Sequence, residues 1–168
     1  MTRYQLAKLV DWASTLQGRK RMQKVVFMLQ AAGCPHNADF FLHHYGPYSE
    51  HVARLADEMT RMQLLTESAR PAPNGLQYSY DLPNQIRQEL CALEATPQGQ
   101  EWAGQLAPFE EKAKQFLQAD LRQLEYASTI VYFRRLGHDW AQAVEMAVSF
   151  KNDWQVRNAL ALAQQAIA

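Results

Sequence analysis

Hydrophobic residues recur every three or four positions through most of the chain, which is the spacing of amphipathic helices. The first such stretch should end at Gly18 and the second at Gly33, where glycine can adopt a left-handed cap conformation. A short aromatic-rich segment, residues 39–45, is too brief for a helix and is expected to be extended. A third helix should follow, with Pro47 in its first turn and Ser49 as its cap.

After this third helix the hydrophobic period changes from 3.6 to two. Residues 64–68 and 76–82 have strand character, and residues 69–75 between them carry the proline and Asn-Gly content of a loop. Three helices, a short strand before the third and then a hairpin are the elements of a winged helix-turn-helix. We therefore predict a winged-helix-like domain over residues 1–82, with its wing tip at 69–75.

The second half of the sequence is helical again. A stretch that begins at Pro108 either continues through Leu124 or breaks before it. Small residues in the Ala-rich C-terminal segment permit close helix packing, within the fold or against a second subunit. No flexible linker separates the halves, so residues 83–168 are expected to form a helical bundle packed on the first domain. Helix starts are predicted at Pro83, at Thr96 with Pro97, at Asp139 with Gln142, and at Asp153.

The amino-acid composition is typical of a globular protein, and its net charge is zero. Hydrophobic residues make up 48% of the chain, and the 17 basic and 17 acidic residues cancel. A dedicated nucleic-acid binder is usually basic, so a DNA role would need a local patch. Two cysteines in unrelated contexts, no signal-peptide pattern and no long apolar run predict a cytoplasmic protein without membrane contact.

Two sequence segments carry a family resemblance. Residues 20–29 (KRMQKVVFML) place a Gln-Lys pair in an apolar helix, and residues 44–49 (HYGPYS) form an aromatic-Gly-Pro turn. Together they resemble the YwgA-type family of uncharacterised prokaryotic winged-helix-like proteins over roughly residues 19–82. More distantly the chain resembles the Panacea (SocA-type) domain found beside toxin genes, which tends to carry an apolar residue after Gly-Pro. The resemblance implies a winged-helix scaffold and, through the Panacea domain, a toxin–antitoxin or phage-defence setting, but no assigned activity.

A basic cluster at the start of the second helix is the first candidate contact site. Arg19, Lys20, Arg21 and Lys24 oppose the positive end of the helix dipole, at a cost of about 0.3–1 kcal/mol each where exposed. Such a cluster could contact phosphates or an acidic partner. The alternative is a solvated cluster with neighbouring carboxylates.

If this domain binds DNA, its third helix would be the recognition helix. Its polar face holds Arg54 and Arg61 but also Glu50, Asp57 and Glu58, for a net charge of −1. We expect ion pairs from Glu50 to Arg54 and from Asp57 to Arg61. This charge balance argues against insertion into a groove.

Histidines and aromatic residues gather around the Gly46-Pro47-Tyr48-Ser49 turn. The histidine spacing matches no zinc finger, so we predict no metal and no cofactor, with surface histidines of which one of the adjacent pair points inward. The aromatic residues are expected in the core, except Tyr48, which is a candidate exposed contact. The histidine group is Cys34, His36, His43, His44 and His51, and the aromatic group is Phe27, Phe40, Phe41, Tyr45 and Tyr48.

No phosphate-binding loop, nucleophile elbow or metalloprotease motif is present in the sequence, so we predict a protein that is not an enzyme. The leading hypothesis is a regulatory or protein-interaction module with an unknown protein partner. The alternative is a DNA-binding regulator that uses the basic cluster, with Arg54 and Arg61 assisting. A hydrolase or metal protein built on the histidines ranks last, and a homodimer is a further expectation.

Overall fold

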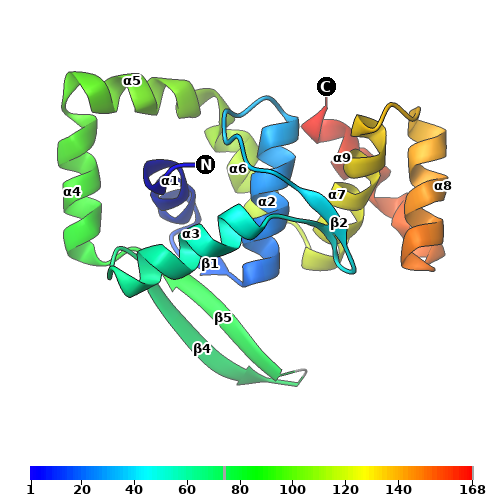
Figure 1. Cartoon of the computed structure of the whole chain (residues 1–168), viewed down its shortest axis with the longest axis horizontal. Coiled ribbons are helices and arrows are strands. Elements are labelled where there is room, and N and C mark those ends of the chain that lie inside the picture. Colours follow the sequence, from blue (N-terminus) through cyan, green and yellow to red (C-terminus); the bar gives the residue numbers. More distant parts are fainter. Residues whose placement is uncertain (74, 168) are drawn as a thin grey trace.

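The computed structural model describes residues 1–73 and 75–167, and it is mainly α-helical with a small antiparallel β-structure (Figure 1). The predicted fold class is therefore confirmed. Among the described residues, no helix is long and apolar enough to cross a membrane. In the N-terminal half the elements are α1 (Arg3–Ala13), β1 (Leu16–Gln17), α2 (Arg19–Ala31), β2 (Phe41–His43), β3 (Gly46–Tyr48), α3 (Glu50–Arg61), β4 (Thr66–Ala72) and β5 (Gly75–Asp81). In the C-terminal half they are α4 (Asn84–Glu94), α5 (Pro97–Leu106), the 3-10 helix η1 (Ala107–Phe109), α6 (Glu110–Gln118), α7 (Leu121–Arg135), α8 (Trp140–Lys151), the 3-10 helix η2 (Trp154–Ala159) and α9 (Leu160–Ala166).

A three-stranded sheet of order β1-β5-β4 accompanies helices α1 to α3. Strand β1 was not predicted, because two residues are too few to show a period. It pairs Leu16 with Tyr80, and both side chains are buried. The prediction that the first helix ends at Gly18 is wrong: α1 ends at Ala13, Ser14 takes the positive φ (59°), and Gly18 precedes α2.

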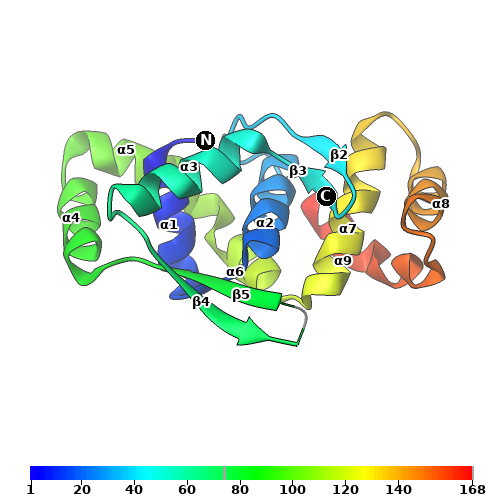
Figure 2. The same cartoon turned by 60° about the horizontal axis from the view of Figure 1, so that its bottom comes forward.

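The β4–β5 hairpin, which we call the wing, projects from the body of the molecule (Figure 2). Strand β4 begins two residues later than predicted and continues four residues further, to Ala72, while β5 is shifted by one residue, to Gly75–Asp81. The predicted loop is therefore confined to the tip, of which Asn74 lies outside the described residues. The proline content was misleading because Pro71 lies in β4, an exposed edge strand where proline is tolerated.

A second, shorter hairpin precedes α3. The predicted extended segment, residues 39–45, contains β2, and an unpredicted strand, β3, follows it, with Leu42 opposite Pro47. Pro47 therefore lies in a strand and not in the first turn of α3, contrary to the prediction. Ser49 caps α3 as predicted.

Helix α7 packs against α2, α8 and α9, at the end of the molecule opposite to α4 and α5 (Figure 1). Residues 126–131 are all buried, which is typical of a helix enclosed on every side. The stretch from Pro108 is broken at residues 119–120, where Asp120 caps α7. Thr96 and Asp139 cap α5 and α8 as predicted, but Asp153 caps η2 and not an α-helix.

Candidate functional site

The turn before α3 is held by Gln23 of α2. The backbone N–H of Ser49 donates to Oε1 of Gln23 (2.8 Å), and Nε2 of Gln23 donates to the carbonyl of Ser49 (3.0 Å). Both residues are buried, and the Ser49 hydroxyl accepts from the N–H of Val52 (3.3 Å) as the α3 cap. One side chain of α2 thus fixes both the end of β3 and the start of α3.

Lys24, the neighbour of Gln23, lies beneath the same turn. Its ammonium group donates to the carbonyl of Pro47 (2.7 Å), and only 2% of the residue is exposed. Burial lowers the pKa of Lys24 to about 7, against an opposing effect of the Glu125 carboxylate. The Gln-Lys pair of the resemblance therefore has a structural role, which is to bind the backbone of the turn.

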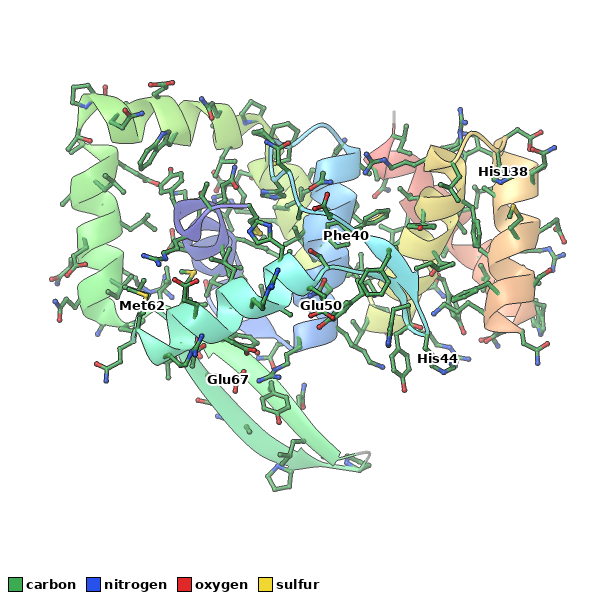
Figure 3. The ribbon with its side chains drawn as sticks, in the orientation of Figure 1. Phe40, His44, Glu50, Met62, Glu67 and His138 are labelled. Carbon is green, nitrogen blue, oxygen red and sulfur yellow. The ribbon has the colours of Figure 1, made fainter. Side chains whose placement is uncertain are left out.

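Helix α7 and its neighbour α8 hold the other side of the short hairpin. Gly46 has a φ of +89°, and a Cβ atom there would lie 2.7 Å from Oγ1 of Thr129. The carbonyl of His44 accepts from Nζ of Lys151 (3.3 Å), which also pairs with Glu125 (2.5 Å). Side chains of α7 and α8 thus contact the backbone at the tip of the short hairpin. Figure 3 labels His44 at this tip.

The outer side of the short hairpin carries exposed aromatic side chains. Phe41 and Tyr45 are 45% and 46% exposed, and the centroid of the Phe41 ring lies 5.7 Å from that of Tyr48. The ammonium of Lys20 lies 3.3 Å above the centre of the Tyr45 ring, a cation–π contact. We call Lys20, Phe41, His43, Tyr45 and Tyr48 the aromatic surface.

The prediction that the aromatic residues belong to the core holds for only part of the group. Phe27 is buried and packs edge-on against the half-buried Phe40, with ring centroids 5.1 Å apart. For Phe41 and Tyr45 it is wrong, because both side chains are nearly half exposed, and the Tyr45 ring lies against Lys20 at the start of α2 and not in the core. Tyr48 is half-exposed.

The four residues of the basic cluster do not form one exposed surface. Arg19 pairs with Glu67 of the wing (2.8 Å), and hydrogen bonding to that carboxylate raises the pKa of Arg19. Arg21 donates to the last carbonyls of the α6 region, and Lys24 is buried. Within the described part of the chain, Lys20 has no carboxylate within 4 Å. Among the described residues, Arg19 is thus the member of the predicted cluster that forms a direct ion pair, while Arg21 and Lys24 donate to backbone carbonyls and the Lys20 ammonium lies on the Tyr45 ring.

The predicted ion pairs along α3 are not formed. Asp57 instead lies 3.8 Å from Arg19, and Glu58 pairs with Arg3 of α1. Arg3 of α1 and Arg19 of α2 thus take the place that the arginines of α3 were expected to have beside the α3 carboxylates. In residues 1–73 and 75–167, Arg54 and Arg61 are therefore exposed without an ion pair.

The histidines are distributed differently from the prediction. His36 is the buried one, and burial lowers its pKa to about 4, whereas both members of the adjacent pair, His43 and His44, are exposed. The Sγ atom of Cys34 lies 3.9 Å from Nδ1 of His36. No three His, Cys, Asp or Glu residues of the described chain are grouped so that they could hold a metal ion.

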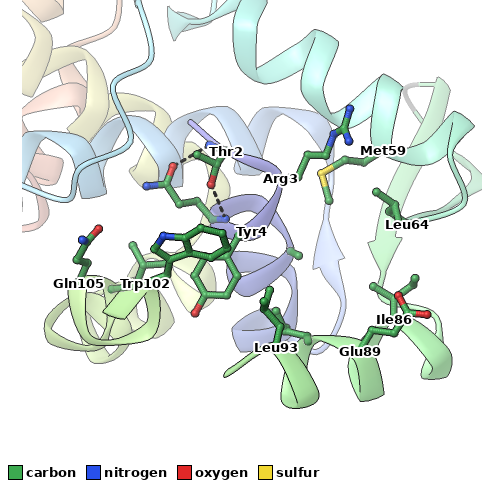
Figure 4. A pocket seen from close by; sticks show the side chains of 14 residues that line it. Thr2, Arg3, Tyr4, Met59, Leu64, Ile86, Glu89, Leu93, Trp102 and Gln105 are labelled. Atoms are coloured by element: carbon green, nitrogen blue, oxygen red, sulfur yellow. Dashed lines mark hydrogen bonds between the residues drawn. The ribbon is translucent and has the colours of Figure 1, made fainter. Parts of the chain in front are cut away.

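Two cavities are relevant to ligand binding. One, of about 220 Å³, lies between the aromatic surface, the start of α2 and α3. The other, of about 620 Å³, lies between α1, α4 and α5 and has mainly apolar walls that include Trp102 and Leu93 (Figure 4). At the larger cavity the Tyr4 hydroxyl donates to Glu94 (2.8 Å) and Arg3 pairs with Glu58. These polar groups are thus already engaged within the protein.

Comparison with known proteins agrees with the YwgA resemblance. No family model matches the chain. The chain is similar to the uncharacterised protein YwgA of Bacillus subtilis (strain 168), at 29% identity over 77 residues. The match covers 46% of this chain and 46% of that protein, so it spans about half the length of the curated relative. The likeness to the Panacea domain stays a prediction.

Proposed function

We propose that this protein is a non-enzymatic regulatory or protein-interaction module on a winged-helix scaffold, and that it binds a partner protein through the aromatic surface. The observation that carries the proposal is the exposure of Phe41 and Tyr45 on a hairpin whose backbone is fixed from behind. Tyrosine and other aromatic residues are enriched at the centres of protein interfaces. Contiguous exposed aromatic side chains on a soluble domain commonly mark such a site.

Rigidity of the short hairpin favours this role. A β-hairpin with strands of three residues is marginal alone, but here Gln23, Lys24 and Lys151 bind its backbone or the turn that follows it. Aromatic side chains have few rotatable bonds, so little conformational entropy is lost when they are covered. Preorganised anchors of this kind reduce the cost of binding.

The scaffold assignment is supported by the order of elements. Helices α1 to α3, the strand order β1-β5-β4 and the projecting wing agree with the winged-helix pattern expected from the sequence. The Panacea resemblance suggests a toxin or a phage-defence protein as the partner class, and the neighbouring genes would test that setting.

The partner-binding proposal is tested by affinity capture from the native cell. The protein with Phe41→Ser and Tyr45→Ser is compared with wild type and with a control that carries Leu136→Ser and Trp154→Ser, two exposed hydrophobic residues of the C-terminal half. We expect capture of the partner to fall about tenfold or more with the hairpin variant and to persist with the control, because removing interface anchors typically costs 2 kcal/mol or more. Unchanged capture by a folded hairpin variant would reject the aromatic surface.

A DNA-binding regulator is the second candidate, favoured by the exposed Arg54 and Arg61 on α3. Because Arg3 and Arg19 pair with two of the α3 carboxylates, that helix is less repulsive to phosphates than its own charge suggests. This candidate predicts retardation of random duplex DNA at low salt, lost with Arg54→Ala and Arg61→Ala. Absence of retardation at low salt would remove it.

A further inference from the structure

The smaller cavity, beneath the aromatic surface, is enclosed by groups of two kinds. Its apolar walls include Met22, Ala53 and Ala56, and aromatic rings from the short hairpin and β5 complete them. The volume of the cavity is about 220 Å³. That space suits a ligand with one flat ring. The ring-bearing residues at the cavity are His43, Tyr45, Tyr48 and Tyr80.

The charges around this cavity are unbalanced. Three cations line it, Arg19, Lys20 and Lys24, whereas Asp57 is the one carboxylate among its described lining residues. Arg19 is neutralised by Glu67 and Asp57. The Lys24 ammonium donates to a backbone carbonyl. Within residues 1–73 and 75–167, the Lys20 ammonium lies on the Tyr45 ring and forms no ion pair. The cavity therefore presents a cationic group without a matching anion.

We propose that this cavity binds a small aromatic carboxylate, with the carboxylate on the Lys20 ammonium and the ring against the tyrosines. Lys20 is exposed at the edge of the cavity, and a charge-assisted hydrogen bond from its ammonium to a carboxylate is stronger than a hydrogen bond between neutral groups. The ring would replace water against apolar and aromatic walls, as in most small-molecule sites. The proposal does not depend on the partner-binding role.

Other ligand classes fit the cavity less well. An aromatic cage with one carboxylate would suit a methylated ammonium, but the Lys20 ammonium already occupies the Tyr45 face and would repel it. A nucleotide needs a larger space and more unpaired cations than Lys20 alone supplies. A single-ring monoanion satisfies both the volume and the charge.

The proposal is tested by following backbone amide NMR signals while sodium benzoate is added. We expect saturable shifts for residues of α2, the short hairpin and α3 that line the cavity. Sodium acetate, which lacks the ring, and benzamide, which lacks the charge, should each bind about tenfold more weakly or worse. Equal binding of benzamide, or shifts confined to other parts of the protein, would overturn the assignment.

Variants give the second arm of this test. Lys20→Met keeps the length of the side chain and removes its charge, so benzoate affinity should fall about tenfold or more, while Lys20→Arg should retain most of it. Ala53→Leu should abolish binding by filling the cavity. Lys112→Ala, which removes a lysine outside the cavity lining, should have no effect. Benzoate affinity unchanged in a folded Lys20→Met variant would overturn the proposal.

Discussion

The two β-hairpins of this protein differ in what keeps them in place. The wing has seven-residue strands and extends into solvent, where its own ladder supports it over most of its length. The short hairpin has three-residue strands, and side chains of α2 and α8 bind its backbone or the turn that follows it, while α7 closes over Gly46. The shorter hairpin is therefore the more tightly fixed one. A fixed hairpin presents its aromatic residues in one geometry.

The largest expected difference concerns one glycine in each hairpin. Gly46→Ala should destabilise the protein by about 3–4 kcal/mol, because positive φ strain is joined by overlap with Thr129 Oγ1. Gly75→Ala in the wing meets nothing within 4 Å and should cost about 1 kcal/mol from strain alone. Urea unfolding of both variants measures the difference. Equal costs would mean that α7 does not restrict the short hairpin.

The pH dependence of stability tests the contact beneath the short hairpin. With its pKa lowered to about 7 by burial, folded Lys24 is neutral at higher pH, while the unfolded side chain keeps its proton up to the ordinary value of 10.5. The unfolded state therefore binds more protons in this window, and stability should rise by about 2–3 kcal/mol from about pH 7 to about pH 9.5. The charged groups that act on Lys24 are Glu125, Lys151 and Lys20.

Lys24→Met is the matched variant for that measurement. It lacks the titrating amine, so the slope of unfolding free energy against pH should become flatter over the same range. Chemical denaturation at several pH values measures the slope. A slope as steep as that of wild type would show that Lys24 stays charged under the turn.

Removal of the Gln23 amide should have a somewhat smaller effect. Gln23→Ala leaves the buried N–H of Ser49 without its acceptor, while the Ser49 carbonyl keeps the bond from the Ala53 N–H, so the change should cost about 2 kcal/mol. The control, Gln77→Ala on the exposed wing, should change stability by less than about 0.5 kcal/mol. Thermal or urea unfolding compares the two. A cost for Gln23→Ala no larger than that of the control would contradict the anchoring role.

The smallest effect is expected at the base of the wing. Glu67→Gln removes the ion pair with the half-exposed Arg19 but keeps an acceptor for the Tyr80 hydroxyl, so it should cost less than about 1 kcal/mol. The same unfolding assay measures it, and added salt should reduce the difference further. A larger loss of stability for Glu67→Gln than for Gln23→Ala would mean that the wing is held more tightly than the short hairpin.

Much of the helical fold was predictable because its helices have long amphipathic periods and side-chain caps such as Ser49 and Thr96. Strand β1 was not, since two residues carry no period and pair with residues more than sixty positions away. The extent of strand β4 was not predictable, because prolines in residues 69–75 are typical of a loop. An exposed strand tolerates Pro71, and sequence does not show which strand lies at an edge.

The candidate site was predictable only in part. The Gln-Lys pair and the Gly-Pro turn were recognised together, but their direct contact joins residues more than twenty positions apart. The roles of Thr129 and Lys151 depend on still longer separations, which local patterns do not encode. Residue type also could not show that Phe41 and Tyr45 face solvent, because aromatic residues occur both in cores and at interfaces.

Site-specific photocrosslinking in the native cell tests whether the aromatic surface contacts a partner protein. A photoreactive amino acid placed at Tyr45 of the short hairpin is compared with one placed at Gln77 of the wing, since both positions are exposed. We expect a discrete protein crosslink from Tyr45 that is absent from Gln77, and a crosslink to a second copy would identify the partner as the chain itself. A protein crosslink from Gln77 with none from Tyr45 would contradict the account.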